Sequence, residues 1–361
     1  KNAGNLRAGR RKSAVSRWYE GIHEERSNII YSRIRLSRNW DECVFPSRLD
    51  EAGSRQLVER LKEGLKDAPT RDGGIFSWYA LETMNGAKKQ ALRERRILNR
   101  TAVEMSRPGG LYLSEDESCS LLLGTDDHIR LQLLAPGLDL EQLWKAADEL
   151  DDYINERFSY AFDEKYGYLT TFPTNVGTGL KACVVLHLPM LSQVRKFQSI
   201  VGDMGRLGTA IRGLYGEGSE NYGNMYELSN QRSLGQSEKE IIEQVAKAAA
   251  QLNNQELRVR NAALGARRLE REDETWKSYG ILKYARRITE KDARIFLSQL
   301  MAGEEDGVIS FEKERSLYSL MIGIKPANLA LWASRPLDKD EADCVRAAYI
   351  RERLPRIIES A

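Results

Sequence analysis

A polar loop with two glycines runs directly into an apolar, β-branched segment. Of all stretches in the sequence, this junction says most about the fold that the chain can adopt and the ligands that it can bind. Residues 173–189 read PTNVGTGLKACVVLHLP. Gly177 and Gly179 leave backbone N–H groups open to an anion, and Lys181 follows with a positive charge. The loop therefore suits a phosphate cradle, although the same pattern also forms plain tight turns. Neither the P-loop nor the dinucleotide-binding spacing is present.

Size and charge narrow the class of protein. The 361 residues are enough for two domains, or for one large domain with an appendage. Charged residues make up 30% of the chain but nearly cancel, leaving a net charge of +2. Such a balance gives no whole-molecule field for nucleic acid or a membrane surface. No apolar run approaches the ~18 residues of a membrane span. We therefore expect no nucleic-acid and no membrane partner.

Cysteine and histidine usage indicates a reducing compartment. None of the four cysteines, Cys43, Cys119, Cys183 and Cys344, has the spacing of a zinc or redox motif. With three histidines in the chain, a histidine-based metal site is not expected, and we predict no metal-ligating residues. The basic segment 1–17 lacks the apolar core of a secretory signal. These features favour a cytoplasmic protein.

Periodicity predicts a mixed fold. Alternation over residues 28–36 predicts a strand with Arg33 and Arg35 on one face. Further expected strands are 111–113, 120–123, 129–134, 182–188, 207–214 and 224–229; expected helices are 50–67, 138–162, 192–201 and 237–264, with 77–96 mixed. These elements lack βαβ regularity, which favours an α+β domain with an antiparallel sheet flanked by helices. We place it at residues 1–255, followed by an all-helical domain at 256–361.

Four stretches of the first domain carry charge in unusual places: residues 32–39, 126–130, 173–181 and 212–220. Arginine forks match phosphate oxygens, so Arg33 and Arg35 suit a polyphosphate, unless they form a solvated face paired with carboxylates. Asp126 and Asp127 precede a strand carrying Arg130. A carboxylate can clamp a guanidinium and withdraw its proton. Together these groups supply the cations and carboxylates that phosphoryl transfer requires, the cations for the phosphates and the carboxylates for a cationic acceptor.

The four stretches follow in the order found in the phosphagen (guanidino) kinases, and the chain resembles that family from about residue 16 to residue 354. The last stretch, RGLYGEGSE at 212–220, is similar to the bacterial protein-arginine kinases in particular. So are residues 279–282 and 350–354 near the end of the chain. The resemblance implies a phosphagen-kinase-like catalytic domain and a C-terminal domain for dimerisation and phosphoarginine binding.

The resemblance also implies roles for single residues. Arg33, Arg35 and Arg130 match arginines that contact the nucleotide phosphates, and Lys181 stands where the family has another. Asp126 matches the glutamate that acts on the substrate guanidinium. In the last stretch, Arg212 and Glu217 match residues that the protein-arginine kinases need for activity, and Glu220 lies on the same loop.

The implied reaction moves the γ-phosphoryl group of ATP, with Mg²⁺, onto exposed arginines of protein substrates. The implied partners are a zinc-binding activator protein and a Clp protease system, within protein quality control and the stress response. A homodimer or a higher homo-oligomer is expected.

The chain departs from the family pattern at several positions. Aspartate replaces glutamate at Asp126, phenylalanine replaces a reactive cysteine at Phe172, and lysine replaces arginine at Lys181. Ala102 replaces a histidine, and Ala342 replaces an arginine, although Asp343 is retained. Two alternatives therefore stay open beside the protein-arginine kinase. One is a pseudokinase or adaptor that binds nucleotide or a partner kinase, and the other is a kinase of free guanidines.

Overall fold

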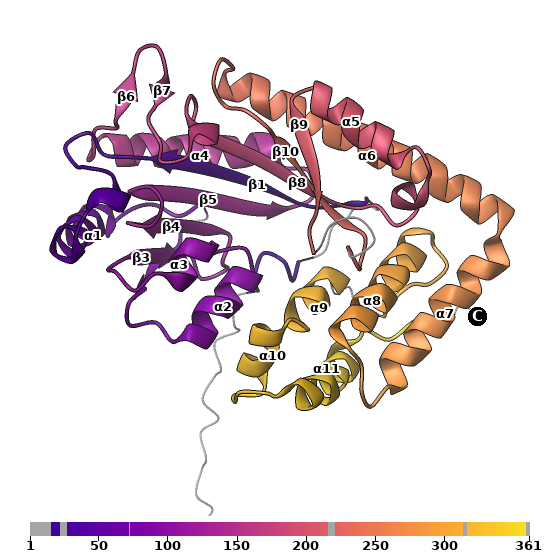
Figure 1. The fold of residues 1–361 in the computed structure, drawn as a ribbon. Coiled ribbons are helices and arrows are strands. Elements are labelled where there is room, and N and C mark those ends of the chain that lie inside the picture. Colours follow the sequence, from indigo (N-terminus) through magenta and orange to yellow (C-terminus); the bar gives the residue numbers. More distant parts are fainter. Residues whose placement is uncertain (1–15, 22–26, 72, 216–220, 313–315, 359–361) are drawn as a thin grey trace, which may run out of the picture.

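The computed structural model describes residues 16–21, 27–71, 73–215, 221–312 and 316–358. Within them, one eight-stranded sheet runs in the order β2-β3-β4-β5-β1-β8-β10-β9 with antiparallel neighbours (Figure 1). Its strands are β1 (Ile29–Arg38), β2 (Ser77–Ala80), β3 (Gly110–Leu113), β4 (Cys119–Leu123), β5 (Ile129–Pro136), β8 (Leu180–His187), β9 (Thr209–Gly213) and β10 (Met225–Asn230). β6 (Phe162–Asp163) and β7 (Gly167–Tyr168) form a separate hairpin. The predicted antiparallel α+β fold is confirmed.

Helices flank the sheet and follow it in the chain. The first group is α1 (Glu51–Leu65), α2 (Gly86–Glu94), α3 (Arg100–Glu104), α4 (Leu140–Asn155), α5 (Phe197–Arg206) and α6 (Glu238–Ala266). The C-terminal helices are α7 (Arg268–Tyr284), α8 (Glu290–Glu305), α9 (Leu317–Gly323), α10 (Pro326–Trp332) and α11 (Lys339–Arg353). Short 3₁₀ turns are η1 (Pro46–Arg48), η2 (Pro173–Asn175) and η3 (Leu191–Gln193).

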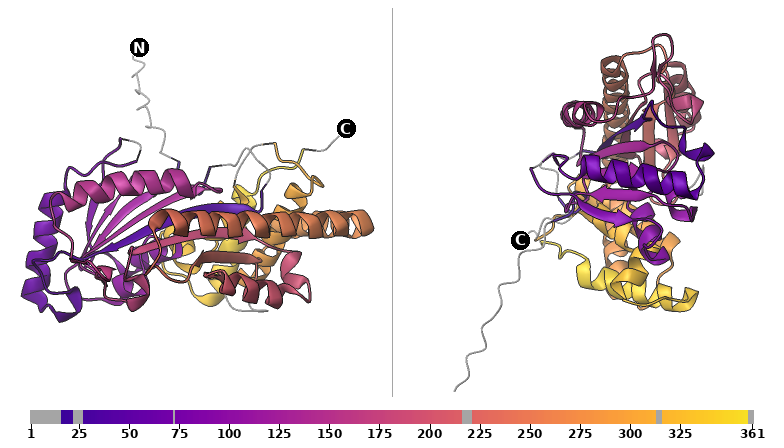
Figure 2. Two further views of the ribbon diagram at one scale, coloured as in Figure 1. Left: turned by 90° about the horizontal axis from the view of Figure 1, so that it is seen from above. Right: turned by 90° about the vertical axis from the view of Figure 1, so that its left-hand side faces the viewer.

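The alternation of β1 determines which face of the sheet is apolar. Ile34 and Leu36 are completely buried in the main core, whereas Arg33 and Arg35 point to the opposite face. The helices α4 and α6 lie along the apolar face and contribute a stripe of buried residues to it (Figure 2). The sheet therefore separates an apolar core from a face that carries charge.

A second core joins the sheet to the C-terminal helices. Tyr31, Val185 and Met225 from three strands pack in one buried cluster with Tyr318 and Met321 of α9. In Figure 1 these helices gather on the side of the sheet that carries α2 and α3. The C-terminal helices therefore cover part of the charged face.

Two predicted helices differ from the structure, and the predicted domain boundary falls within a third helix. The helix expected over 138–162 ends at Asn155, because the Ala161 amide bonds to the Asn39 carbonyl oxygen at 2.7 Å and draws the chain away. The helix expected over 192–201 starts later, at Phe197. The expected domain boundary at 255/256 falls within α6, which continues to Ala266; that boundary stays a prediction.

Candidate active site

A row of cations crosses the charged face of the sheet. In the strand register Arg35 stands between Lys181 and Gln132, and Ser37 stands opposite Arg130. Directly opposite partners share a face. Two positions along, Arg33 faces Cys183, and Arg212 on the edge strand faces Glu227. We expect these cations to share one region, and the register places all of them on one side of the sheet.

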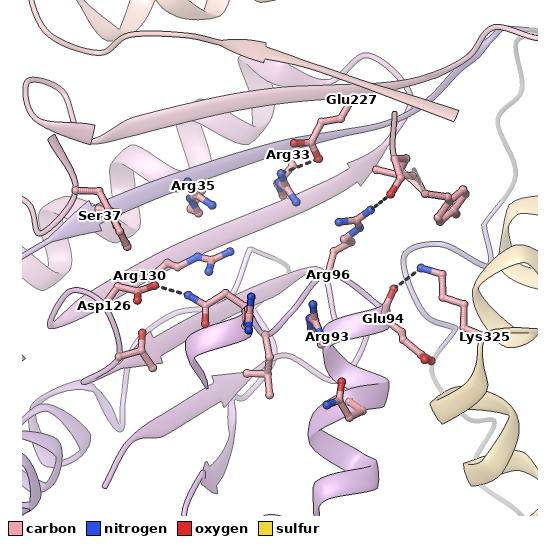
Figure 3. A pocket seen from close by; sticks show the side chains of 18 of the residues that line it. Arg33, Arg35, Ser37, Arg93, Glu94, Arg96, Asp126, Arg130, Glu227 and Lys325 are labelled. Atoms are coloured by element: carbon pink, nitrogen blue, oxygen red, sulfur yellow. Dashed lines mark hydrogen bonds and ion pairs between the residues drawn. The ribbon is translucent and has the colours of Figure 1, made fainter. Parts of the chain in front are cut away.

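A cavity of about 610 Å³ opens over the middle of this face (Figure 3). Arg33, Arg35, Arg130 and Asp126 all line it. Four other candidates lie outside its lining: Lys181, Arg212, Gly177 and Gly179. Glu217 and Glu220 lie outside the described residues, so the structure does not place them.

Arg33 is held by one carboxylate but keeps part of its guanidinium unpaired. Its Nη2 lies 2.9 Å from Glu227 Oε2 and 3.3 Å from Cys183 Sγ, while its buried Nε has no partner in the described residues. Burial works to raise the pKa of Glu227, but Arg33 and Arg96 outweigh it and hold that pKa below its usual range. Glu227 therefore stays ionised beside Arg33.

Arg35 and Arg130 lack such an ion pair within the described residues. The salt bridges of the described residues engage neither, and Arg130 Nη2 only donates to Gln132 Oε1 at 3.2 Å. Burial, followed by repulsion from Arg33, lowers the pKa of Arg35. Burial, followed by Arg35 and Arg33, lowers the pKa of Arg130 well below its ordinary value. Since arginine stays protonated, the shifts measure desolvation and repulsion that a bound polyanion would relieve.

The adjacent acids Asp126 and Asp127 have different surroundings. Asp127 is buried, and its Oδ1 accepts from Asn39 Nδ2 at 2.8 Å and from the Thr171 amide at 2.7 Å. Asp126 lines the cavity, accepts from Asn99 Nδ2, and has no ion pair within the described residues. Asp127 therefore supports the turn, and Asp126 is the acid available to a ligand.

Like Asp127, His128 stabilises the turn rather than facing a ligand. Its Nδ1 accepts from the Trp40 amide at 2.9 Å, so Nε2 carries the proton and donates to the Val44 carbonyl oxygen at 2.9 Å. Burial lowers the pKa of His128. A neutral ring with both nitrogens engaged fixes the turn rather than exchanging protons with a substrate.

Phe172 forms part of the cavity wall near Asp126. Its ring is 48% exposed although it lines the cavity. The preceding residue, Thr171, donates its hydroxyl to the Asp126 carbonyl oxygen and its amide to Asp127 Oδ1, both at 2.7 Å. These bonds tie the residue before Phe172 to the turn that contains Asp126, and both Phe172 and Asp126 line the cavity.

The remaining loop candidates have other contacts. Lys181 Nζ donates to the Asn230 carbonyl oxygen, and burial lowers the pKa of Lys181. Arg212 is exposed and lines a neighbouring cavity between β9 and α8. Gly177 and Gly179 adopt positive φ angles of 112° and 65°. A side chain at either glycine would collide with backbone atoms, so the tight-turn alternative accounts for both positions.

The cavity also contains residues that sequence reasoning missed. The end of α2 contributes Arg93, Glu94 and Arg96, and the C-terminal helices contribute Glu290, Arg294 and Lys325. The run RERR at 93–96 is a sequence pattern that indicates a basic helix end. Nothing in the sequence pairs this run with Glu290, Arg294 or Lys325, because packing makes that contact.

The described residues lack two kinds of feature. They contain no group of three or more His, Cys, Asp and Glu side chains placed to hold a metal ion. Among the helices described there, none combines the length and the apolar character needed to cross a bilayer.

Sequence profiles of two domain families match the chain. The ATP:guanido phosphotransferase C-terminal catalytic domain matches residues 56–259, and the protein-arginine kinase McsB C-terminal domain matches residues 268–360. The protein-arginine kinase of Bacillus subtilis (strain 168) is 38% identical over 343 residues, covering 95% of this chain and 94% of that protein. The protein-arginine kinase of Halothermothrix orenii is 36% identical over 341 residues, covering 94% and 97%.

Solved structures share the fold. The duplicated taurocyamine kinase from Schistosoma mansoni has a TM-score of 0.58 at 23% identity, over 66% of this chain and 34% of that chain. Lombricine kinase has a TM-score of 0.58 at 21% identity, over 72% and 74%. The implied phosphagen-kinase fold is thereby confirmed. The profiles and the relatives together show that the chain belongs to the protein-arginine kinase family of ATP:guanido phosphotransferases.

Proposed function

We propose that this chain transfers the γ-phosphoryl group of ATP to arginine side chains of proteins. One observation carries the proposal: Arg35 and Arg130 are partly buried and form no ion pair among the described residues, in the cavity that Asp126 also lines. A polyphosphate supplies the missing negative charge, and a guanidinium supplies the missing cation for the acid. Membership of the protein-arginine kinase family supports the same pair of substrates.

The residues divide between the two substrates. Arg33, Arg35 and Arg130 hold the phosphates, and Mg²⁺ enters with ATP on phosphate oxygens and water. A single acid such as Asp126 can clamp the guanidinium and accept one of its protons. An arginine nitrogen then forms a bond to the γ-phosphorus while the bond from phosphorus to the bridging oxygen breaks. ADP leaves, and the proton goes to Asp126.

The test is transfer itself. Purified chain is incubated with Mg-ATP and an unfolded protein, and acid-labile phosphate on arginine is measured. The wild type is expected to form it, Arg212→Ala is expected to abolish it, and Asp126→Asn is expected to lower its rate about 100-fold or more. A signal that survives in both variants comes from a contaminant and contradicts the proposal.

Two controls separate the alternatives. Nucleotide binding without any arginine phosphate, on substrates or on the chain itself, would establish the pseudokinase or adaptor instead. Free arginine in place of the protein tests for a kinase of small guanidines. Equal or better transfer to free arginine would move the substrate class from proteins to metabolites.

Family membership supports further proposals about the cellular setting. They are a cytoplasmic location, a homodimer or higher homo-oligomer, a zinc-binding activator protein and a Clp protease system in protein quality control. We also propose that residues 256–361 form the dimerisation and phosphoarginine-binding domain. There Asp343, beside Ala342, is buried and accepts from Arg346 Nη1 at 2.6 Å.

A further inference from the structure

The end of α2 is bonded directly to the start of α10. Glu94 Oε1 accepts from the Ala327 amide at 3.0 Å, and Glu94 Oε2 accepts from the Asn328 amide at 2.9 Å. The Asn328 side chain adds a bond from Nδ2 to Glu94 Oε2 at 2.7 Å. One carboxylate therefore satisfies two amides that the first turn of a helix leaves without partners.

Two more bonds close this contact. Lys325 Nζ donates to the Glu94 carbonyl oxygen at 2.9 Å, as Figure 3 shows. Arg95 Nε donates to Asn328 Oδ1 at 2.6 Å. We call Glu94, Lys325 and Asn328 the joint. The joint holds the last turn of α2 from the side of the C-terminal helices.

The joint fixes the backbone from which Arg96 enters the cavity. Arg96 has a φ of 69°, which is costly for a residue with a side chain and persists only where neighbouring contacts enforce it. Its carbonyl oxygen accepts from Gln132 Nε2 at 2.8 Å, and its Nη2 donates to the Leu214 carbonyl oxygen at 2.9 Å. Arg96 is therefore held between the joint, β5 and the end of β9.

Arg96 lines the same cavity as Arg33 and Glu227, so its charge faces the space that the triphosphate would occupy. Together with Arg33 it also holds the pKa of Glu227 below its ordinary range. Glu227 is the carboxylate that pairs with Arg33, and an uncompensated carboxylate there would repel a triphosphate. Arg96 shares the neutralisation of Glu227, which leaves more of the Arg33 charge for a bound anion.

We propose that the joint is a positioning device through which the C-terminal helices set Arg96 and thereby the affinity of the cavity for nucleotide. The inference rests on the proposed function for its ligand, a nucleoside triphosphate. It assigns Glu94, Lys325 and Asn328 as positioning residues, with Arg96 as the group they position.

The experiment measures binding of ATP to the full chain by calorimetry. Glu94→Gln places an amide NH₂ against the α10 amides and is expected to raise the Kd for ATP roughly tenfold. Asp338→Ala is the matched control, since Asp338 Oδ1 accepts from the Glu341 amide at 2.8 Å and caps α11, and alanine removes that cap. Both variants are expected to lose stability, but Asp338→Ala should keep the wild-type Kd.

A double-mutant cycle shows whether the effect passes through Arg96. Arg96→Ala is expected to raise the Kd alone, and Glu94→Gln is expected to add little to it, because residues coupled in one network are not additive. Additive effects, or a wild-type Kd in Glu94→Gln, would overturn the inference. If Glu94→Gln does not fold, Asn328→Ser removes only the side-chain bonds and should shift the Kd in the same direction.

The comparison of Kd values can fail or succeed independently of the phosphoarginine assay. A wild-type chain that binds ATP but forms no phosphoarginine contradicts the proposed function, while the Kd comparison still decides the joint. A wild-type chain that binds no nucleotide overturns both.

Discussion

Neighbouring residues with the same functional group have different roles in this protein. Asp126 and Asp127 are adjacent acids, but only Asp126 lines the cavity, and Asp127 is buried in bonds to Asn39 and Thr171. Position relative to the turn, rather than residue type, decides which acid meets a ligand.

Substituting each acid separates the two roles. Asp126→Asn is expected to lower kcat about 100-fold or more, because the proton acceptor is lost, with a nearly unchanged free energy of unfolding. Asp127→Asn is expected to lower the free energy of unfolding by about 2 kcal/mol, since buried charge-assisted bonds are lost. Single-turnover transfer and urea unfolding of both variants provide the comparison. A stable Asp127→Asn with lost activity would reverse the assignment.

Phe172 gives the substrate side an aromatic wall. A guanidinium stacked on the ring gains about 0.5–1 kcal/mol, so Phe172→Leu is expected to raise KM for an arginine peptide about 3-fold. Phe172→Trp is expected to keep the wild-type KM, and the Kd for ATP should be unchanged in both. Steady-state kinetics with a peptide series measures this. A lower KM in Phe172→Leu would show that the ring obstructs the acceptor.

At the scale of elements, the loop before β8 is shaped by packing. Gly179 has a φ of 65°, and a Cβ there would lie 2.7 Å from the Ser37 carbonyl oxygen and collide with Arg38. Arg38 is itself buried and paired with Asp151 at 2.7 Å. The loop thus lies against a buried ion pair that leaves no room for a side chain.

Two glycines of positive φ allow a matched test. Gly179→Ala is expected to lower the free energy of unfolding by about 2–3 kcal/mol, from backbone strain together with displacement of Arg38. Gly235 has a φ of 80°, but a Cβ there would meet no atom within 4 Å. Gly235→Ala should therefore lower the free energy of unfolding only by the backbone strain, about 1 kcal/mol. Urea midpoints give the difference. Equal losses in the two variants would show that Arg38 moves at no cost.

The whole molecule is joined by the second core and by the joint. Tyr31 and Val185 of the sheet share one apolar cluster with Tyr318 of α9, so the C-terminal helices bury part of the charged face. Lys325 is buried at this contact, and its pKa is lowered to about 7, chiefly by burial. Arg96 and Arg294 contribute to this lowering, whereas Glu94 and Glu290 oppose it. Lys325 Nζ also lies 4.9 Å from the Tyr215 ring centroid.

The depressed pKa of Lys325 makes stability depend on pH. Between pH 7 and about 10 the unfolded chain binds a proton at this lysine that the folded chain has released. The free energy of unfolding therefore rises with pH in this window, relative to Lys325→Met, by an amount on the order of a few kcal/mol. Urea unfolding of both proteins across the window measures it. Parallel curves would show that the folded lysine has an ordinary pKa.

Much of the fold was predictable because its determinants are local. Alternation in β1 predicts that Arg33 and Arg35 share a face, and the antiparallel register extends that face to Arg130. Helix ends were less predictable: α4 ends at Asn155 because a distant carbonyl, that of Asn39, captures the chain beyond it. Similarly, nothing in the sequence indicates that the Lys181 ammonium group bonds the Asn230 carbonyl oxygen, and its role toward phosphate stays a prediction.

The sequence by itself determined the family, the strands and the set of charged residues, because motifs and periodicity are properties of short segments. Only the tertiary structure decided which charges are neutralised and which are not. Arg33 finds Glu227 across 194 positions, and Lys325 reaches the Glu94 carbonyl oxygen across 231. Partners so distant along the chain meet only once the sheet and both cores have formed, since packing rather than local preference brings them together.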